Sequence, residues 1–204
     1  MVTGGVSGRP HAKLPRMNPS IHEQPLPYVD LLPERAAEAV DLVVIHCTEL
    51  PDLAMAREYG ERVLHASGTG NSGHYYIDRD GTICRYAPGE RVAHHVRGHN
   101  EHSIGIELVN RGRYPDWWDS RRQSMTEPYP ALQIDALRAL LAQLRGSFPN
   151  LTQIAGHEDL DTAMMPATDD PALEIRRKLD PGPMFPWDAV LRDSGLLRIG
   201  GDHP

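Results

Sequence analysis

The chain has 204 residues, a length that suits one large domain and is short for two. Apolar residues make up 40% and charged residues 24%, which fits one sizeable core and excludes a membrane protein. The formal net charge is −7, and this acidic balance argues against general nucleic-acid binding, which needs a basic face.

Residues 1–27 are rich in Gly, Pro and polar side chains, so they are expected to form an extended arm before a domain at residues 28–199. The arm lacks the apolar stretch of a secretory signal, and no segment approaches the ~20 apolar residues of a membrane-spanning helix. Cys47 and Cys84 form no CxxC pair and are expected to be buried, unreactive thiols rather than a disulfide.

Several elements are predicted in the first half of the chain. The β-branched run at residues 41–46 predicts a buried strand that ends at His46. Residues 53–66 have helix-forming side chains at helical spacing. Residues 74–86 predict a hairpin that turns at Asp-Gly, and residues 103–109 alternate as a further strand does.

The second half continues the alternation of strands and helices. Leu and Ile recur with helical spacing between residues 134 and 144, and this amphipathic helix is expected to end near Gly146. Residues 151–155 predict a short strand that leads to His157, and a last helix is expected to begin near Trp187. The order indicates one α/β domain with a central sheet covered by helices.

Two histidines and an aspartate occupy positions that suit chemistry. His46 ends one predicted strand, His157 follows another after a glycine, and Asp180 precedes Pro-Gly-Pro. Ligands gather at strand ends in α/β folds. Two imidazoles and one carboxylate are typical of an open zinc site, where the metal lowers the pKa of a water towards ~7 and polarises a carbonyl.

Other motifs fit less well. Residues 157–161 begin like the zincin helix motif, but Asp161 stands where the second histidine is needed. Residues 68–73 match GxGxxG, yet they are expected to follow a helix and precede a strand, so they predict a flexible loop and not a dinucleotide site. The sequence has no GxSxG elbow, which disfavours an α/β-hydrolase.

An ordered set of short segments covers about residues 40–190: 43–46 (VVIH), 72–76 (SGHYY), 79–81 (RDG), 93–95 (AHH), 103–108 (SIGIEL), 156–157 (GH) and 178–183 (KLDPGP). In this order they resemble the amidase-2 family of zinc-dependent N-acetylmuramoyl-L-alanine amidases, relatives of the peptidoglycan recognition proteins. The resemblance implies a central mixed β-sheet flanked by helices. It also implies hydrolysis of the amide between N-acetylmuramic acid and L-alanine in peptidoglycan or muropeptides.

The resemblance further implies roles for five residues. His46, His157 and Asp180 match the zinc ligands, and Glu107 matches the general base for the attacking water. Lys178 matches the lysine that stabilises the oxyanion.

Each role has a simpler alternative. Glu107 would fit an exposed edge strand, Lys178 lies in a basic run typical of a solvated face, and Asp180 before proline suits a turn.

Three residues are expected near the substrate groove. The resemblance implies substrate contacts for His74, His95 and Asn100, although the two histidines also suit support of the zinc ligands. The aromatic residues in 111–130 suit either stacking on the substrate or a packing cluster.

The chain departs from the family at two places. His157 and Asp180 are 23 positions apart, more than is usual, and the extra segment at about 162–174 is expected to be a loop bordering the groove. His94 stands where a tryptophan is usual.

Two other functions and three locations stay open. A non-catalytic peptidoglycan-binding module and a metallopeptidase acting on another amide are the alternatives to the amidase. The sequence as it stands predicts a cytoplasmic protein that recycles soluble, including 1,6-anhydro, muropeptides. The segments 109–112 (VNRG) and 185–187 (FPW) resemble the envelope-associated branch instead, and a phage lysin is the third possibility.

Overall fold

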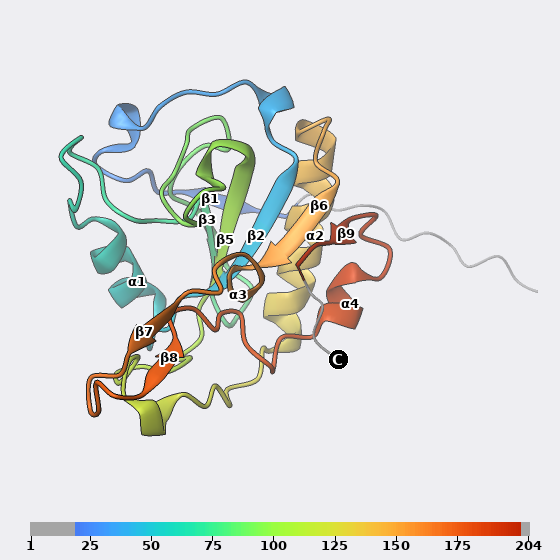
Figure 1. The fold of residues 1–204 in the computed structure, drawn as a ribbon. Coiled ribbons are helices and arrows are strands. Elements are labelled where there is room, and N and C mark those ends of the chain that lie inside the picture. Colours follow the sequence, from blue (N-terminus) through green and yellow to red (C-terminus); the bar gives the residue numbers. More distant parts are fainter. Residues whose placement is uncertain (1–18, 201–204) are drawn as a thin grey trace, which may run out of the picture.

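The structure is a computed structural model in which residues 19–200 are described. Their main sheet has the strand order β1-β4-β3-β5-β2-β6-β9 (Figure 1). Neighbouring strands are parallel except β3 and β4, which are antiparallel, so the predicted mixed sheet is confirmed. The strands of this sheet are β1 Ile21–Glu23, β2 Leu42–Cys47, β3 Tyr75–Ile77, β4 Ile83–Arg85, β5 Ser103–Leu108, β6 Gln153–Gly156 and β9 Leu197–Arg198.

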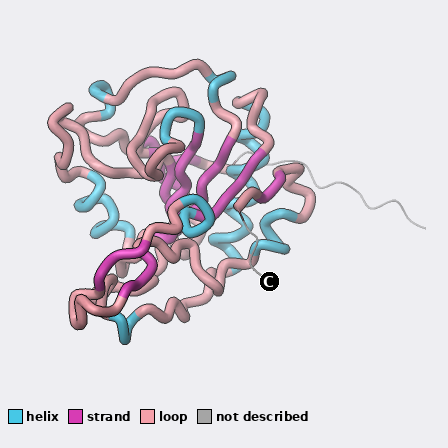
Figure 2. The backbone as a smooth tube through the Cα atoms, in the orientation of Figure 1, coloured by secondary structure: helices cyan, strands magenta, loops and turns pink. Residues whose placement is uncertain are grey.

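Helices flank the sheet and loops fill much of the remaining surface (Figure 2). The α-helices are α1 Leu53–Gly60, α2 Ala131–Ser147, α3 His157–Leu160 and α4 Trp187–Leu191, and α2 contacts α4. Short 3₁₀ helices lie at Val29–Leu31, Ala37–Ala39, Asn100–His102 and Ser120–Arg122. Within residues 19–200, no helix has the length and apolar character needed to cross a bilayer.

Side-chain alternation in β2 and β5 separates the core from the site. Ile45 in β2 and Ile106 in β5 belong to the main core, which also contains the buried leucines of α2. Their neighbours His46 and Glu107 point to the opposite face, because successive side chains of a strand alternate. The same pattern that buries the strands against α2 therefore presents these two polar side chains on the other face.

The predicted hairpin, strands and long helix are confirmed, with small shifts at their ends. Helix α1 ends at Gly60 rather than residue 66, and α2 runs to Ser147, so Gly146 lies inside it. Gly81 in the hairpin turn has φ 88°, a conformation that favours glycine. Both cysteines are buried and free, as expected.

The described part of the predicted N-terminal arm belongs to the domain. Strand β1 pairs with β4 at the edge of the sheet, and Leu26 is 2% exposed. The boundary predicted after residue 27 is therefore wrong, because a three-residue edge strand is too short to show a period in the sequence. Residues 1–18 of the predicted arm lie outside the described residues.

The extra segment is more ordered than the predicted loop. Its ends form an antiparallel pair, β7 Met164–Pro166 and β8 Glu174–Arg176. Trp118 O accepts a hydrogen bond from Thr168 N at 2.8 Å, and Asp169 Oδ1 accepts from Ser120 N at 2.7 Å. This hairpin therefore packs on the loop around residues 117–120.

A buried ion pair between Arg113 and Glu49 connects the loops after β2 and β5 to the C-terminal end of this hairpin. Arg113 donates to both carboxylate oxygens of Glu49, at 2.7 and 2.8 Å, and the two side chains are 1% and 9% exposed. The same guanidinium donates to Arg176 O and Arg177 O at 3.2 and 3.3 Å. It thereby ties the loop after β2 to the backbone that leads to Asp180.

Removing one partner of this pair should destabilise the fold. We expect Arg113→Met to lower the free energy of unfolding by about 3–5 kcal/mol, because Glu49 would stay buried without its partner. The double variant Arg113→Met/Glu49→Gln, which removes both charges, should recover much of the loss. Urea unfolding followed by circular dichroism measures these effects. Arg138→Met, at a more exposed pair with Asp135, is the control; an Arg113→Met loss no larger than the control's would contradict the prediction.

Candidate metal centre

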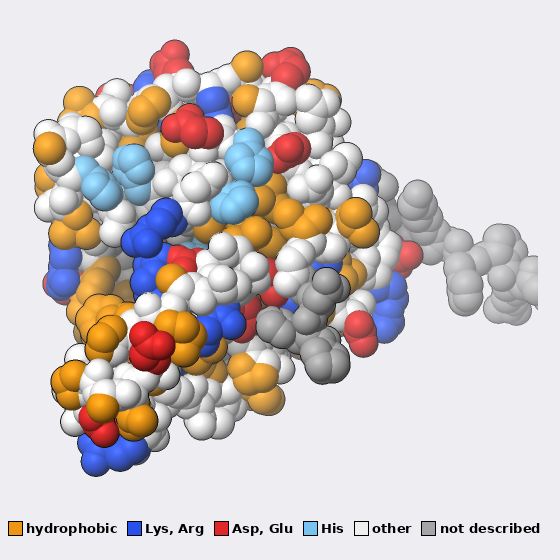
Figure 3. Space-filling view, viewed as in Figure 1, with side chains coloured by type: hydrophobic (Ala, Val, Ile, Leu, Met, Phe, Trp, Pro, Cys, Tyr) orange, Lys and Arg blue, Asp and Glu red, His pale blue; other side chains and the backbone are white. Residues whose placement is uncertain are grey.

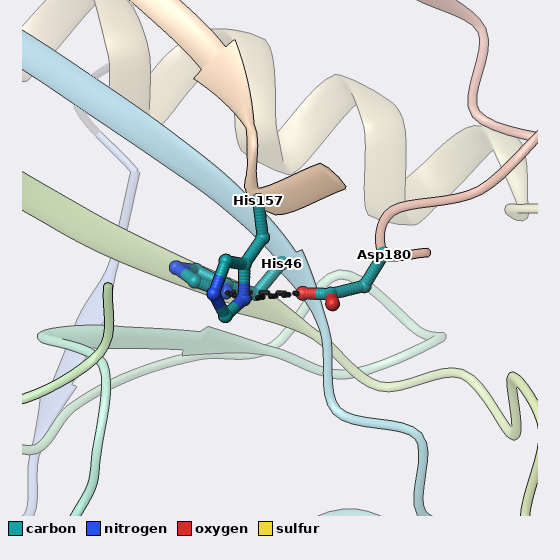
Figure 4. A group of neighbouring side chains, drawn as sticks. All are labelled: His46, His157 and Asp180. Carbon is teal, nitrogen blue, oxygen red and sulfur yellow. Dashed lines mark hydrogen bonds and ion pairs between the residues drawn. The ribbon is translucent and has the colours of Figure 1, made fainter. Parts of the chain in front are cut away.

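Three side chains from separate elements converge on one point (Figure 4). His46 comes from β2, His157 begins α3 directly after β6, and Asp180 lies in the loop before α4. His46 Nδ1 lies 3.0 Å from His157 Nδ1, and each of these atoms lies 3.1 Å from Asp180 Oδ2. All three residues are buried.

The backbone around Asp180 is held against the end of β6. Asp180 O accepts a hydrogen bond from Glu158 N at 2.8 Å, and Tyr129 donates from its hydroxyl to Pro181 O at 2.7 Å. A Cβ atom at Gly156 would lie 2.8 Å from the Pro181 ring, so glycine permits this approach. These contacts bring Asp180 to His157 across the long intervening segment.

The three residues suit a zinc ion. Burial, followed by the neighbouring His157, lowers the pKa of His46 to about 4, so its ring is neutral at pH 7. Burial alone would raise the pKa of Asp180, but His157, Lys178 and hydrogen bonds from both histidines hold it well below its usual range. Asp180 Oδ1 and His157 Nε2 are buried with no protein partner. Two imidazoles and an ionised carboxylate form a zinc donor set that leaves one coordination position open.

Glu107 lies beside these ligands. It pairs in register with His46 across β5 and β2, and a Cβ atom at Gly73 would lie 2.8 Å from its Cγ. The exposed-edge alternative is wrong, because β5 lies between β3 and β2. Burial and the charge of Asp180 raise the pKa of Glu107 to about 8, against the lowering effect of Lys178.

Lys178 is half-buried and lines the same cavity, so the solvated-face alternative for it is wrong. The lysine charge lowers the pKa of both the Glu107 and the Asp180 carboxyl groups. The structure therefore brings a base, a cation and a candidate metal site together.

These residues lie in a cavity of about 770 Å³, within the range of small-molecule sites. In Figure 3, Lys and Arg side chains lie beside Asp and Glu on the face in view, with histidines above and a hydrophobic lobe below. The lining includes His46, Glu107, His157, Lys178 and Asp180, together with His65, Asn71, His94, Arg97, Trp117, Trp118, Met165 and Arg177.

The residues predicted to touch substrate divide into three cases. His95 lines the cavity and its Nδ1 lies 3.1 Å from His46 Nε2, so it supports a candidate ligand directly. Asn100 also lines the cavity, but its Oδ1 accepts from the backbone N–H groups of His95 and Val96.

His74 does not contact the cavity, and the prediction of a substrate contact there is wrong. The residue is 0% exposed. Its Nε2 donates to Arg91 O, and its Nδ1 accepts from Gly105 N. Both ring nitrogens are therefore used inside the fold.

Several cavity residues were not selected from the sequence. Arg97 and Arg177 add positive charge to the lining, and Met165 comes from β7. Ser103 lies outside the lining, with its hydroxyl oxygen 3.2 Å from His95 Nε2. Alternation along β5 marks Ser103 as facing the same side as Glu107, but no short-range pattern marks the two arginines. Trp117 packs partly into a core cluster, as the packing alternative for the aromatic loop expects. Trp118 is 44% exposed on the cavity wall, where stacking on the substrate stays a prediction.

Comparisons with known proteins agree with this site. Residues 36–183 match a family model described as N-acetylmuramoyl-L-alanine amidase. The 1,6-anhydro-N-acetylmuramyl-L-alanine amidase AmpD of Enterobacter cloacae is 29% identical over 189 residues, which cover 80% of this chain and 84% of AmpD.

Solved structures share the fold. The endolysin N-acetylmuramoyl-L-alanine amidase LysCS from Clostridium intestinale gives a TM-score of 0.59 at 22% identity, covering 89% of this chain and 99% of LysCS. AmpDh3 from Pseudomonas aeruginosa, solved in complex with an anhydromuramic pentapeptide, gives 0.58 at 26% identity, covering 79% of this chain and 62% of that one.

The matched range includes His46, Glu107, His157, Lys178 and Asp180. It confirms the resemblance that the ordered motifs predicted. The chain belongs to the N-acetylmuramoyl-L-alanine amidase family and is an enzyme of that class.

Proposed function

We propose that this amidase uses a zinc ion held by His46, His157 and Asp180, and that its substrates are soluble muropeptides. The observation that carries the proposal is the convergence of two imidazole nitrogens and a carboxylate oxygen within 4.8 Å of one another, in a cavity that also contains Glu107. Three protein ligands leave room for catalysis, whereas structural zinc sites are closed by four.

A bound zinc ion supplies two effects: it lowers the pKa of a water and polarises the carbonyl of the scissile amide. Glu107 would accept the proton of the attacking water and pass it to the departing L-alanine nitrogen, because an amine anion is a poor leaving group. The raised pKa of Glu107 suits this second step. A cation held nearby would favour its ionised form for the first step, since opposite charges lower the pKa of a carboxyl group.

Lys178 would stabilise the oxyanion that develops on the amide carbonyl. It lies on the same cavity as Glu107, and a lysine in a partly buried site acts more strongly on a developing negative charge than one in water. Arg97 and Arg177 on the cavity wall add positive charge that suits an anionic peptide fragment.

The soluble substrate is supported by two relatives. AmpD of Enterobacter cloacae is named for 1,6-anhydro-N-acetylmuramyl-L-alanine, and the AmpDh3 structure contains an anhydromuramic pentapeptide. Polymeric wall is the alternative, and an endolysin is among the structural neighbours. A cytoplasmic location stays a prediction that cell fractionation can test.

Digestion of purified substrates tests the proposal. We expect zinc-loaded protein to convert an anhydro-muropeptide into the free sugar and a peptide that begins with L-alanine, both identified by mass spectrometry. Chelated protein should be inactive and should recover when zinc is added. Cleavage of intact sacculi at an equal or higher rate would overturn the soluble-substrate part, and activity that survives complete zinc removal would overturn the zinc part. Cleavage at another amide would indicate the peptidase alternative.

Glu107→Gln separates catalysis from metal binding. We expect this variant to bind zinc normally and to lose about 10²-fold or more in kcat, the scale of a general base. His46→Ala should instead lose zinc, measured by elemental analysis. Glu101→Gln, at an exposed carboxylate, is the matched control. Full activity in Glu107→Gln would contradict the assigned role.

Lys178→Met should lower kcat about 10²–10³-fold with little change in KM, because the lost interaction forms with the oxyanion and not with the ground state. Lys178→Arg, which keeps the charge, should retain more activity. The control is Arg192→Met at an exposed position. Equal rates for Lys178→Met and the wild type would exclude the oxyanion role.

A further inference from the structure

A closed set of hydrogen bonds holds the backbone of Gly73, just before β3. Ser72 donates its hydroxyl proton to Gly73 O at 2.9 Å. The Ser72 hydroxyl oxygen lies 3.1 Å from that of Tyr76, and because the Ser72 proton is already used, Tyr76 donates to Ser72. The Tyr76 oxygen in turn accepts from Gly73 N at 3.3 Å. The amide hydrogen and the carbonyl oxygen of Gly73 are therefore both held by side chains.

The Tyr76 side chain is itself fixed in this position. It is 5% exposed, and its ring stacks on that of Tyr86 with centroids 4.2 Å apart. Burial, followed by the charge of Glu107, raises the pKa of the Tyr76 hydroxyl above its usual range. The proton that Tyr76 donates to Ser72 is therefore present at neutral pH.

Glu107 lies against the backbone that these hydrogen bonds hold. Tyr76 and Glu107 pair in register across β3 and β5, and both side chains line the cavity. A Cβ atom at Gly73 would lie 2.8 Å from Glu107 Cγ and 3.5 Å from Glu107 Oε1, so the glutamate side chain packs directly on the Gly73 backbone. Within residues 19–200, the Glu107 carboxylate has no hydrogen-bond or ion-pair partner in the protein. Packing against Gly73, and not a polar contact, therefore orients this side chain.

We propose that Ser72, Gly73 and Tyr76 are positioning residues for Glu107. The two hydroxyl groups fix the Gly73 backbone, and the absence of a side chain at Gly73 leaves the space in which Glu107 lies beside the candidate metal centre. A general base must lie within about 3 Å of the proton that it takes, so a small displacement of Glu107 would slow the reaction without altering the metal ligands. The catalytic consequence rests on the proposed function, whereas the position of Glu107 is a property of the fold.

Two substitutions test this positioning by steady-state kinetics of the zinc-loaded enzyme. Gly73→Ala should lower kcat about 10²-fold, the usual effect of misplacing a reacting group by about 1 Å. Tyr76→Phe leaves the Gly73 amide without its acceptor and should lower kcat about 10-fold. KM and zinc content should keep their wild-type values in both variants. A raised KM with an unchanged kcat would indicate substrate contacts instead and would overturn the inference.

The chain offers a matched control for each substitution. Tyr86→Phe removes the hydroxyl of the tyrosine that stacks on Tyr76, and this hydroxyl is buried without a hydrogen-bond partner among residues 19–200. Gly146→Ala adds a Cβ atom in α2 that would have no other atom within 4 Å. Both controls should keep the wild-type kcat, so a tenfold loss in Tyr86→Phe would also contradict the inference.

Crystal structures of the metal-free variants give a second measurement that needs no activity. We expect the Glu107 side chain to be displaced in Gly73→Ala and the Gly73 backbone to shift in Tyr76→Phe. An unmoved Glu107 in Gly73→Ala would overturn the inference; if this variant fails to fold, the structure and kinetics of Tyr76→Phe decide.

The two measurements separate this inference from the proposed function. If the wild type cleaves no muropeptide, a displaced Glu107 would still support the inference, and the proposed function would be overturned. If Glu107→Gln is inactive but Gly73→Ala and Tyr76→Phe both match the wild type, the proposed function stands and the inference is overturned.

Discussion

Parallel pairing of β2 with β5 on one side and β6 on the other is the constraint on which the site depends. The pairing aligns His46 with Glu107 and places His157 one residue beyond the end of β6. Since the register of a buried strand is determined by which residues face the core, a slip of one position would turn His46 into the core and Ile45 towards the cavity. The apolar packing against α2 therefore determines the position of the polar site on the opposite face.

The candidate metal centre is a cluster of buried polar atoms, some of which have no hydrogen-bond partner in the protein. Two imidazole nitrogens and one carboxylate oxygen lie about 3 Å apart in a buried setting, and Asp180 Oδ1 has no protein partner. Such a cluster costs folding free energy unless a cation neutralises it. Such an unfavourable contribution to the folding free energy is expected at a functional site. The apolar core between the β-strands and α2 stabilises the fold and offsets it.

The long segment between His157 and Asp180 folds so that these two residues still come together. Strands β7 and β8 close the insertion on itself, and Arg113, paired with Glu49, holds the backbone at Arg176 and Arg177. Glu158 then fixes the carbonyl of Asp180. The segment contributes Met165 to the cavity lining, and its contacts hold Asp180 beside His157.

The sequence by itself determined the α/β class, because strand and helix periodicity are local patterns, and strand ends marked the metal-ligand candidates. The mixed sheet and the role of Glu107 came from the family resemblance, which ordered segments such as Ile-Gly-Ile-Glu and Asp-Pro-Gly-Pro carry. The sequence could not reveal that β1 joins the sheet edge or that His74 uses both ring nitrogens inside the fold, since those outcomes depend on partners distant in sequence. Only the tertiary structure decided which atoms surround the His46 ring: Nδ1 lies 3.1 Å from Asp180 Oδ2, and Nε2 lies 3.1 Å from His95 Nδ1. These contacts exist only once β2, the loop before β5 and the loop before α4 are packed together, because the residues involved are far apart in the sequence.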